Sequence, residues 1–517
     1  MISIFVHGVM IVSLTMCVRT STVEDDMFYP SLLFASGLLL VLILAVLVGS
    51  QGPRWPLVYR TLGWGPEPRH YYRPKTIKRG YEAVEEAFAE TVREGRETGI
   101  QFAAFVKGEL VVDLSGGLFL DGARKNADYS NNSDDDTSSL LDSDTYSCVW
   151  SCSKVVTSIV VAWLVDRGYL EYTAKVRDYW PEFTGGGKDE LTVAQVMKHA
   201  AGLYRAPINT IRLADLSREN ILKGKMSDII EKMDREYPKV WKRRLTYHGI
   251  TRGWILNEIA RRVDPQKRTI GQILREEFTQ PLQIDKECYL GLPAELSDPV
   301  TNPKLRQIDP TPCFLYVVCA KLCQLLLIPR TVDWGFPLAY TWAITYTSLN
   351  WIPAMAFFNP QRLGMYKFTK QPEFSQGEIP SCNVQASARA LATIANSMGT
   401  LSPEIFRNGD TTAQKLRQDE ETRELYPLSK VTFNDGGFCV MSLDKTDSPT
   451  VPGAPISLGW FGFNGSLMAF HPQGDFSLAF QPTCFNELDP RSRVHKITEA
   501  FMSCARKLHG DNFGEVK

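Results

Sequence analysis

The chain has 517 residues, of which 44% are hydrophobic, 22% charged and 11% aromatic. These values are ordinary for globular proteins, and they exclude a mainly disordered, collagen-like or coiled-coil chain. Its 57 basic and 58 acidic residues give a formal net charge of −1, so the basic excess of a nucleic-acid-binding protein is absent and no nucleic-acid partner is expected.

The 11 cysteines are scattered along the chain without a C-x-x-C pair. Zinc sites usually need such pairs, and a chain that can bury a large core does not need a dense disulfide scaffold. We therefore expect no metal and no cofactor.

The N-terminal part predicts a membrane anchor. Residues 31–49 read SLLFASGLLLVLILAVLVG, an uncharged run that at about 1.5 Å per residue can cross a hydrocarbon core of about 30 Å. We expect a transmembrane helix in an anchor of residues 1–50, with a buried core helix as the alternative and residues 2–18 as a candidate second span. A basic linker, 51–79, follows the span, so the positive-inside rule places the C-terminal bulk of the chain in the cytosol.

The remainder predicts one α/β domain of the α+β type over residues 80–510. The hydrophobic pattern predicts a helix over 80–96, two strands over 100–106 and 110–114, an apolar helix over 153–168, and a C-terminal helix over 491–508. Amphipathic helices are expected within 214–263, and glycine-rich strands within 431–481. Two insertions are expected, an acidic loop over 126–145 and an apolar segment over about 311–360.

A serine and a lysine at the start of the helix over 153–168 suggest a nucleophile. Ser151 and Lys154 form an S-x-x-K pattern, and a helix places residues three apart on one face. An ammonium that loses hydration beside the serine can accept its proton. The alternative is that Ser151 caps the helix while Lys154 is solvated.

Several further segments occur in a fixed order. They are GYLEYTAKVRDYWPEF at 168–183, LTVAQVMKHAAGL at 191–203, LTYHGITRGWILNEIARRV at 245–263 and GEIPSCNVQASARALATIAN at 377–396. With the S-x-x-K, they resemble the serine beta-lactamase and penicillin-binding-protein superfamily over residues 78–510, in particular class C beta-lactamase-related proteins and family VIII carboxylesterases. The resemblance implies an antiparallel sheet flanked by helices, an all-helical subdomain, and the nucleophile at their junction.

The resemblance also implies roles for single residues. Ser151 matches the acylated nucleophile, Lys154 its proton-relay partner, and Tyr247 the tyrosine of the Y-x-N motif, with a structural core tyrosine as the alternative. Gly249 replaces the asparagine of that motif. His248 in its middle place and His199 in K-H-A-A-G-L are expected to support the site without chemistry.

The third family motif corresponds to Trp460-Phe461-Gly462. Gly462 allows the strand to approach the acyl group, and the N–H of Phe463 would join that of Ser151 in an oxyanion hole. Relatives that recognise a carboxylate carry a cation at this strand, whereas Trp460 offers an apolar wall like that of family VIII esterases. The alternative for Trp460 is core packing.

The sequence thus predicts a membrane-anchored serine hydrolase. It would form an acyl-enzyme on Ser151 with esters or amides of small or apolar acyl groups, either small molecules or lipid-like substrates. A beta-lactamase or peptidase, and a non-catalytic scaffold that retains the fold, remain alternatives. The oligomeric state stays open.

Overall fold

The computed structural model describes residues 69–93, 99–119, 141–205, 211–236, 246–306, 371–409, 412, 421–424, 430–443, 456–483 and 490–515. These residues belong to one compact unit formed by Pro68–Phe119, Asp128–Phe314 and Asp333–Lys517. The predicted anchor 1–50, residues 126–140 of the acidic loop and the apolar insertion 311–360 lie outside the described residues. Within the described ranges, no helix has the length and apolar character to cross a membrane.

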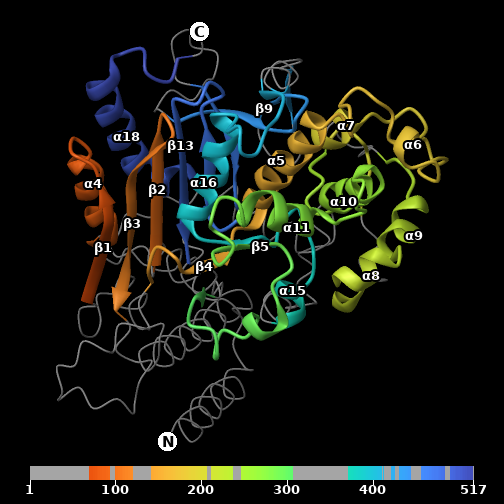
Figure 1. The fold of residues 1–517 in the computed structure, drawn as a ribbon, viewed down its shortest axis with the longest axis horizontal. Coiled ribbons are helices and arrows are strands. Elements are labelled where there is room, and N and C mark those ends of the chain that lie inside the picture. The colour runs from red at the N-terminus through yellow and green to blue at the C-terminus, as the bar shows by residue number, and fades with distance from the viewer. Residues whose placement is uncertain are drawn as a thin grey trace, which may run out of the picture. The chain divides into compact units, whose positions relative to one another are not determined.

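A nine-stranded antiparallel sheet forms one side of the fold, in the order β1-β3-β2-β13-β12-β11-β10-β9-β8 (Figure 1). Its strands are β1 (Arg69–Ile77), β2 (Gly99–Val106), β3 (Glu109–Phe119), β8 (Glu421–Glu424), β9 (Lys430–Phe433), β10 (Cys439–Ser442), β11 (Ile456–Phe461), β12 (Leu467–Phe470) and β13 (Phe476–Pro482). Strand β2 pairs with β13, so the two ends of the domain meet within the sheet and the middle of the chain is inserted between them.

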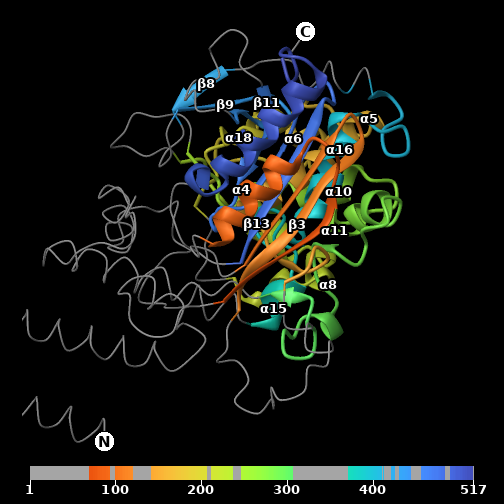
Figure 2. The same ribbon diagram turned by 90° about the vertical axis from the view of Figure 1, so that its left-hand side faces the viewer.

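Helices cover both faces of this sheet. Helices α4 (Glu82–Arg93) and α18 (Pro490–His509) pack together on one face, in front of the strands in Figure 2, and α16 (Ala388–Gly399) packs on the other. Side chains alternate accordingly: Phe102 and Phe480 join the core under α4 and α18, whereas Ala103 and Ala479 join the core that contains α16. Small side chains on the second face let α16 approach the strands closely.

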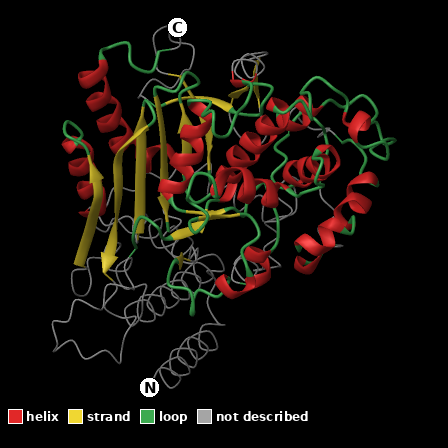
Figure 3. Ribbon diagram, in the orientation of Figure 1, coloured by secondary structure: helices red, strands yellow, loops and turns green. Residues whose placement is uncertain are grey.

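The middle of the chain is mostly helical, as Figure 3 shows by colour. Its helices are α5 (Ser153–Asp166), α6 (Val176–Tyr179), α7 (Val193–Met197), α8 (Arg218–Leu222), α9 (Lys225–Glu231), α10 (Thr251–Val263), α11 (Ile270–Ile273) and α15 (Pro372–Gln376). It also contains a second small sheet, of β5 (Cys288–Tyr289), β7 (Gln385–Ala386), β4 (Tyr146–Cys148) and β6 (Leu305–Arg306). The predicted all-helical subdomain therefore includes short strands, which are too brief to show an alternating pattern.

Helix α5 occupies the centre of the larger core. All of its 14 residues are buried, which agrees with a segment that is apolar on every side. It contacts α10, α16 and β11, and these contacts hold the residues at its N-terminus in place.

Strand β1 lies within the segment predicted as a basic linker, 51–79. It is an edge strand that pairs only with β3, and none of the side chains from His70 to Ile77 is buried. The strand is charged, and its register shifts between Pro74 and Thr76, as edge strands tolerate. It therefore has no apolar alternation by which the sequence could have revealed it.

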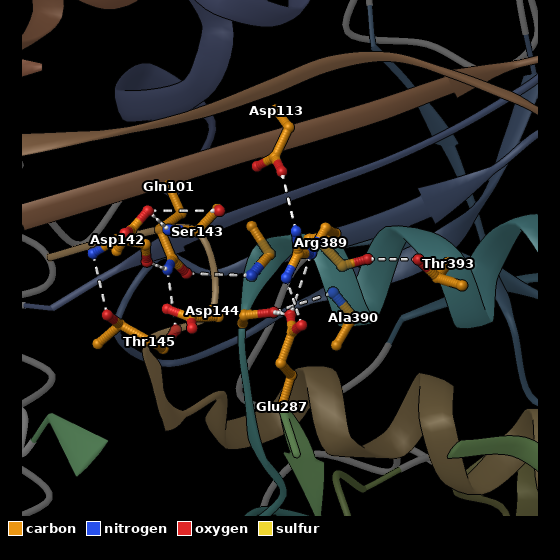
Figure 4. A network of polar contacts seen from close by, with 12 residues as sticks. Gln101, Asp113, Asp142, Ser143, Asp144, Thr145, Glu287, Arg389, Ala390 and Thr393 are labelled. Carbon is orange, nitrogen blue, oxygen red and sulfur yellow. Dashed lines mark hydrogen bonds and ion pairs between the residues drawn. The ribbon is translucent and has the colours of Figure 1, made fainter. Parts of the chain in front are cut away.

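A buried polar network joins the main sheet to α16 and to the segment before β5 (Figure 4). Arg389 of α16 forms a bidentate ion pair with Glu287. Its Nη1 also lies 3.6 Å from Oδ2 of Asp113 in β3. Burial raises the pKa of Asp113 to about 6, although Arg389 opposes this. Gln101 of β2 donates to the Thr145 carbonyl at 2.8 Å, so the end of the predicted acidic loop is tied to the sheet.

Candidate active site

Ser151 lies in a tight turn that joins β4 to α5. Residues Trp150–Cys152 form one turn of 3₁₀-helix, and α5 begins at Ser153. Trp150 has a positive φ of 47°, a left-handed conformation that is rare for a bulky residue and that the surrounding structure must enforce. Ser151 makes no side-chain cap for α5, which removes the alternative role considered for it.

Two hydrogen bonds fix this turn from both sides. The N–H of Val149 donates to the Val384 carbonyl beside β7 at 2.9 Å. The Ser466 hydroxyl, in the turn after β11, donates to the Val149 carbonyl at 2.8 Å. The backbone before Ser151 is therefore held between the small sheet and the main sheet.

Lys154 and Tyr247 both contact the Ser151 hydroxyl. Lys154 Nζ donates to Ser151 Oγ at 3.1 Å, and Tyr247 Oη donates to the same oxygen at 2.7 Å. The ammonium also lies 4.7 Å from the centroid of the Tyr247 ring. Lys154 is 3% exposed, so it is not the solvated residue of the alternative interpretation. The three predicted catalytic residues thus form one hydrogen-bonded group, with the geometry that proton transfer to and from a serine requires.

Two backbone carbonyls complete the coordination of the ammonium. Lys154 Nζ donates to the carbonyls of Gly249 and Ser381, each at 2.9 Å. Gly249 stands where the family motif has asparagine, and here its backbone, rather than a side chain, contributes to the site. Ser381 gave no signal in the sequence, because a carbonyl contact does not depend on residue type.

The two histidines that were predicted to support the site, His199 and His248, pack against the segment that carries Tyr247. His199 Nδ1 accepts a hydrogen bond from the His248 N–H at 3.0 Å, and the His199 ring lies 4.8 Å from the Tyr247 ring. His248 Nε2 accepts from the Leu203 N–H at 2.9 Å. Burial lowers the pKa of His248 to about 4 and that of His199 well below its usual value, and nearby cations lower both further. Both rings are therefore neutral near pH 7.

The segment that ends β11 approaches the nucleophile turn closely. A Cβ on Gly462 would lie 2.0 Å from Ser466 Oγ and 2.4 Å from the Val149 carbonyl, so only glycine fits there. Trp460 stacks on Tyr247 with 6.1 Å between ring centroids and also contacts Phe433 at 5.3 Å. The Phe463 ring meets that of Trp150 edge-on at 5.8 Å.

The structure thus brings all eight predicted site residues into one region. It places Ser151, Lys154 and Tyr247 in mutual contact, His199 and His248 behind them, and Trp460, Gly462 and Phe463 on the adjoining strand end. Their chemical roles remain predictions. Within the described part of the chain, no cluster of three histidine, cysteine or acidic side chains could hold a metal.

Comparisons with known proteins identify proteins to which this chain is similar. A protein of Mycobacterium tuberculosis described as esterase/beta-lactamase LipL is 33% identical over 145 residues, which cover 28% of this chain and 31% of that protein. A penicillin-binding protein homolog from Caulobacter crescentus has a similar structure, with 26% identity, a TM-score of 0.57, and coverage of 84% of this chain and 100% of its own. A family VIII carboxylesterase, at 23% identity, shares the fold with a TM-score of 0.58 over 84% of this chain and all of its own.

The family model described as Beta-lactamase matches residues 84–496, which is most of the domain described above. This match bears out the predicted resemblance and, with it, the predicted class of serine hydrolase. The chain belongs to the beta-lactamase family.

Proposed function

We propose that this protein is an acyl-transferring hydrolase in which Ser151 forms the acyl-enzyme. The observation that carries the proposal is the hydrogen-bonded group of Ser151, Lys154 and Tyr247, with 3.1 Å and 2.7 Å to the serine oxygen. Ser151 Oγ attacks the substrate carbonyl, and its proton passes to whichever of Lys154 and Tyr247 is deprotonated, and then to the leaving group. Water reverses these steps and releases the acyl group.

The oxyanion of the tetrahedral intermediate would be held by the N–H groups of Ser151 and Phe463. The close approach of Gly462 to the Val149 carbonyl supports this assignment, because it brings the end of β11 beside the nucleophile turn. Backbone donors that are held rigidly in this way need no reorganisation during the reaction.

The proposed substrate class rests on the aromatic side chains of Trp460, Tyr247 and Phe433. Trp460 stacks on Tyr247 and contacts Phe433, at the strand where carboxylate-recognising relatives would carry a cation. An apolar wall favours esters or amides of small or apolar acyl groups over an anionic beta-lactam or peptide carboxylate. The relative described as an esterase/beta-lactamase and the carboxylesterase fold neighbour are consistent with this choice.

The N-terminal run 31–49 is proposed to anchor this domain in a membrane, with the domain on the cytosolic side. The support is the length of the uncharged run and the basic residues that follow it. Such an anchor would give the site access to lipid-like esters as well as to soluble ones.

Kinetics of matched variants test the proposed reaction. Ser151→Ala should abolish hydrolysis of a short-chain neutral ester, and Lys154→Met should lower kcat/KM by about 10²–10⁴-fold, the usual contribution of a positioned base. The control is Lys188→Met, because Lys188 is also buried and also donates to two carbonyls, of Glu231 and Met233, away from the site.

Lys188→Met should lower stability and leave kcat/KM within a few fold of the wild type. Full activity of Ser151→Ala or Lys154→Met would overturn the assignment. Faster turnover of a chromogenic cephalosporin than of the neutral ester would favour the beta-lactamase alternative, and no turnover by the folded protein would favour a scaffold.

A further inference from the structure

The direction of Lys154 Nζ is set by its three hydrogen-bond partners. Two of them are the carbonyls of Gly249 and Ser381, each at 2.9 Å, and the third is Ser151 Oγ at 3.1 Å. Beside its carbon substituent, the nitrogen has three tetrahedral positions. Because the two carbonyls occupy two of these, the third is directed at the serine oxygen, whether it carries a hydrogen or a lone pair. The placement of the two carbonyls therefore determines where the lysine points.

The two carbonyls belong to segments that lie far apart in the sequence. Gly249 lies just before α10, whereas Ser381 lies in the segment between α15 and β7. The local chain therefore does not fix the spacing between them, and a tertiary contact has to do so.

The hydroxyl of Ser381 supplies such a contact. The Gly253 N–H, in the first turn of α10, donates to Ser381 Oγ at 2.7 Å, and it makes a longer contact of 3.1 Å to the Ile250 carbonyl. Ile250 itself gives α10 no side-chain cap. The side chain of Ser381 is thus bonded to the segment that carries the Gly249 carbonyl, while its own backbone supplies the other carbonyl.

This contact is buried and tightly packed. Ser381 is 0% exposed, and a Cβ on Gly253 would lie 2.4 Å from its nitrogen and 2.7 Å from its Oγ. On the other side, Thr157 Oγ1 donates to the Pro380 carbonyl at 2.6 Å, and Thr157 follows Lys154 by three residues in α5. The segment around Ser381 is therefore bonded both to the helix that carries the lysine and to α10.

We propose that Ser381 is a positioning residue for the reaction, whose hydroxyl keeps the two carbonyls at the spacing that directs Lys154 Nζ at Ser151 Oγ. The inference rests on the proposed function of Ser151 and Lys154. It gives the side chain of Ser381 a role separate from that of its carbonyl, which any residue could supply. The alternative is that the hydroxyl only caps α10.

Kinetics of Ser381→Ala test this role, because alanine keeps the carbonyl and removes the hydroxyl. A misplacement of 1 Å in catalytic geometry can cost about 100-fold in rate, and the loss of one contact should allow a smaller shift. We therefore expect kcat/KM for an activated aryl ester to fall about tenfold. Activity within twofold of the wild type would overturn the inference.

A double-mutant cycle with Lys154→Met separates positioning from a purely structural role. If Ser381 acts through Lys154, its hydroxyl has nothing to position in the Lys154→Met background. Ser381→Ala should then change the residual kcat/KM of that background by less than about twofold. If the tenfold loss recurs there, the hydroxyl only caps α10 and the inference is wrong.

Ser387→Ala is the matched control. Ser387 is also 0% exposed, and its Oγ caps α16 by accepting from the Ala390 N–H at 3.0 Å. Its other side-chain partner is Glu287, which is not a residue of the site. This variant should unfold at a lower temperature and keep kcat/KM within about twofold of the wild type. A tenfold loss here would mean that any lost helix cap has this effect, and it would overturn the inference.

Gly253→Ala disturbs the same contact from the other side and keeps the test available if Ser381→Ala does not fold. Its Cβ meets the backbone as well as the hydroxyl of Ser381, so kcat/KM should fall at least as far as in Ser381→Ala. This loss should likewise vanish in the Lys154→Met background, and its persistence would contradict the proposal.

Reaction with an active-site phosphonate separates this inference from the proposed function. Labelling of Ser151 in the wild type, together with full activity of Ser381→Ala, would refute the inference alone. Absence of labelling in the folded wild type would refute the proposed function.

Discussion

Replacement of Gly462 by alanine tests whether the end of β11 must touch the nucleophile turn. A Cβ at this position would lie 2.4 Å from the Val149 carbonyl, whereas an ordinary contact starts at 3.4 Å, so the two backbones would have to separate by about 1 Å. A misplacement of this size in catalytic geometry typically costs about 100-fold in rate. We expect kcat/KM for a neutral ester to fall by about that factor.

The assay compares Gly462→Ala with Ser466→Ala and with the double variant, each checked by thermal unfolding. Ser466 Oγ is the nearest atom to the added Cβ, at 2.0 Å, and it also bonds Val149. Ser466→Ala alone should lose less activity, and the double variant should stay as low as Gly462→Ala, because the backbone contact remains. Activity of Gly462→Ala within twofold of the wild type would refute the placement of this strand beside the nucleophile.

Three further predictions concern the substrate, the buried network and the anchor. Trp460→Lys should lower kcat/KM for a neutral ester roughly five- to 150-fold, since a polar group in an apolar pocket costs about 1–3 kcal/mol, and should lower that for a carboxylate-bearing ester less. Asp113→Asn should stabilise the protein above pH 6: burial raises the pKa of Asp113 from 3.8 to about 6 against the attraction of Arg389, and this net rise corresponds to about 3 kcal/mol of stability lost as pH rises through that interval. Deletion of residues 1–50 should yield a protein that needs no detergent and retains activity.

Each of these has a clear contrary result. If Trp460→Lys changes kcat/KM by the same factor for both esters, Trp460 is a packing residue and does not line the acyl pocket. Urea unfolding of Asp113→Asn and wild type between pH 4 and pH 8 should show a difference that grows with pH, because the native carboxyl binds its proton more tightly than the unfolded one; a constant difference would contradict the linkage. Full membrane partitioning of the truncated protein would mean that another segment attaches it.

Much of the fold could be predicted because its central elements carry strong local patterns. The strands predicted at 100–106 and 110–114 lie within β2 and β3, and the predicted helix over 153–168 contains α5. In contrast, β1 was assigned to a linker, since its residues are charged and unburied and its pairing with β3 depends on the rest of the sheet. The short strands of the small sheet are likewise defined by their partners and not by their own residues.

The site was predictable where chemistry depends on side chains and not where it depends on backbone. Ser151, Lys154 and Tyr247 were identified from their motifs, and the structure brings them into contact. The carbonyls of Gly249 and Ser381 escaped prediction because any residue can supply a carbonyl.

The most direct test of the central claim is mass spectrometry of the purified protein after reaction with a fluorophosphonate probe. We predict a single adduct on the peptide that contains Ser151, absent in Ser151→Ala, strongly reduced in Lys154→Met and unchanged in Lys188→Met. If the folded protein carries no adduct, or if the adduct lies on another residue and persists in Ser151→Ala, Ser151 is not the nucleophile and the proposed reaction is wrong.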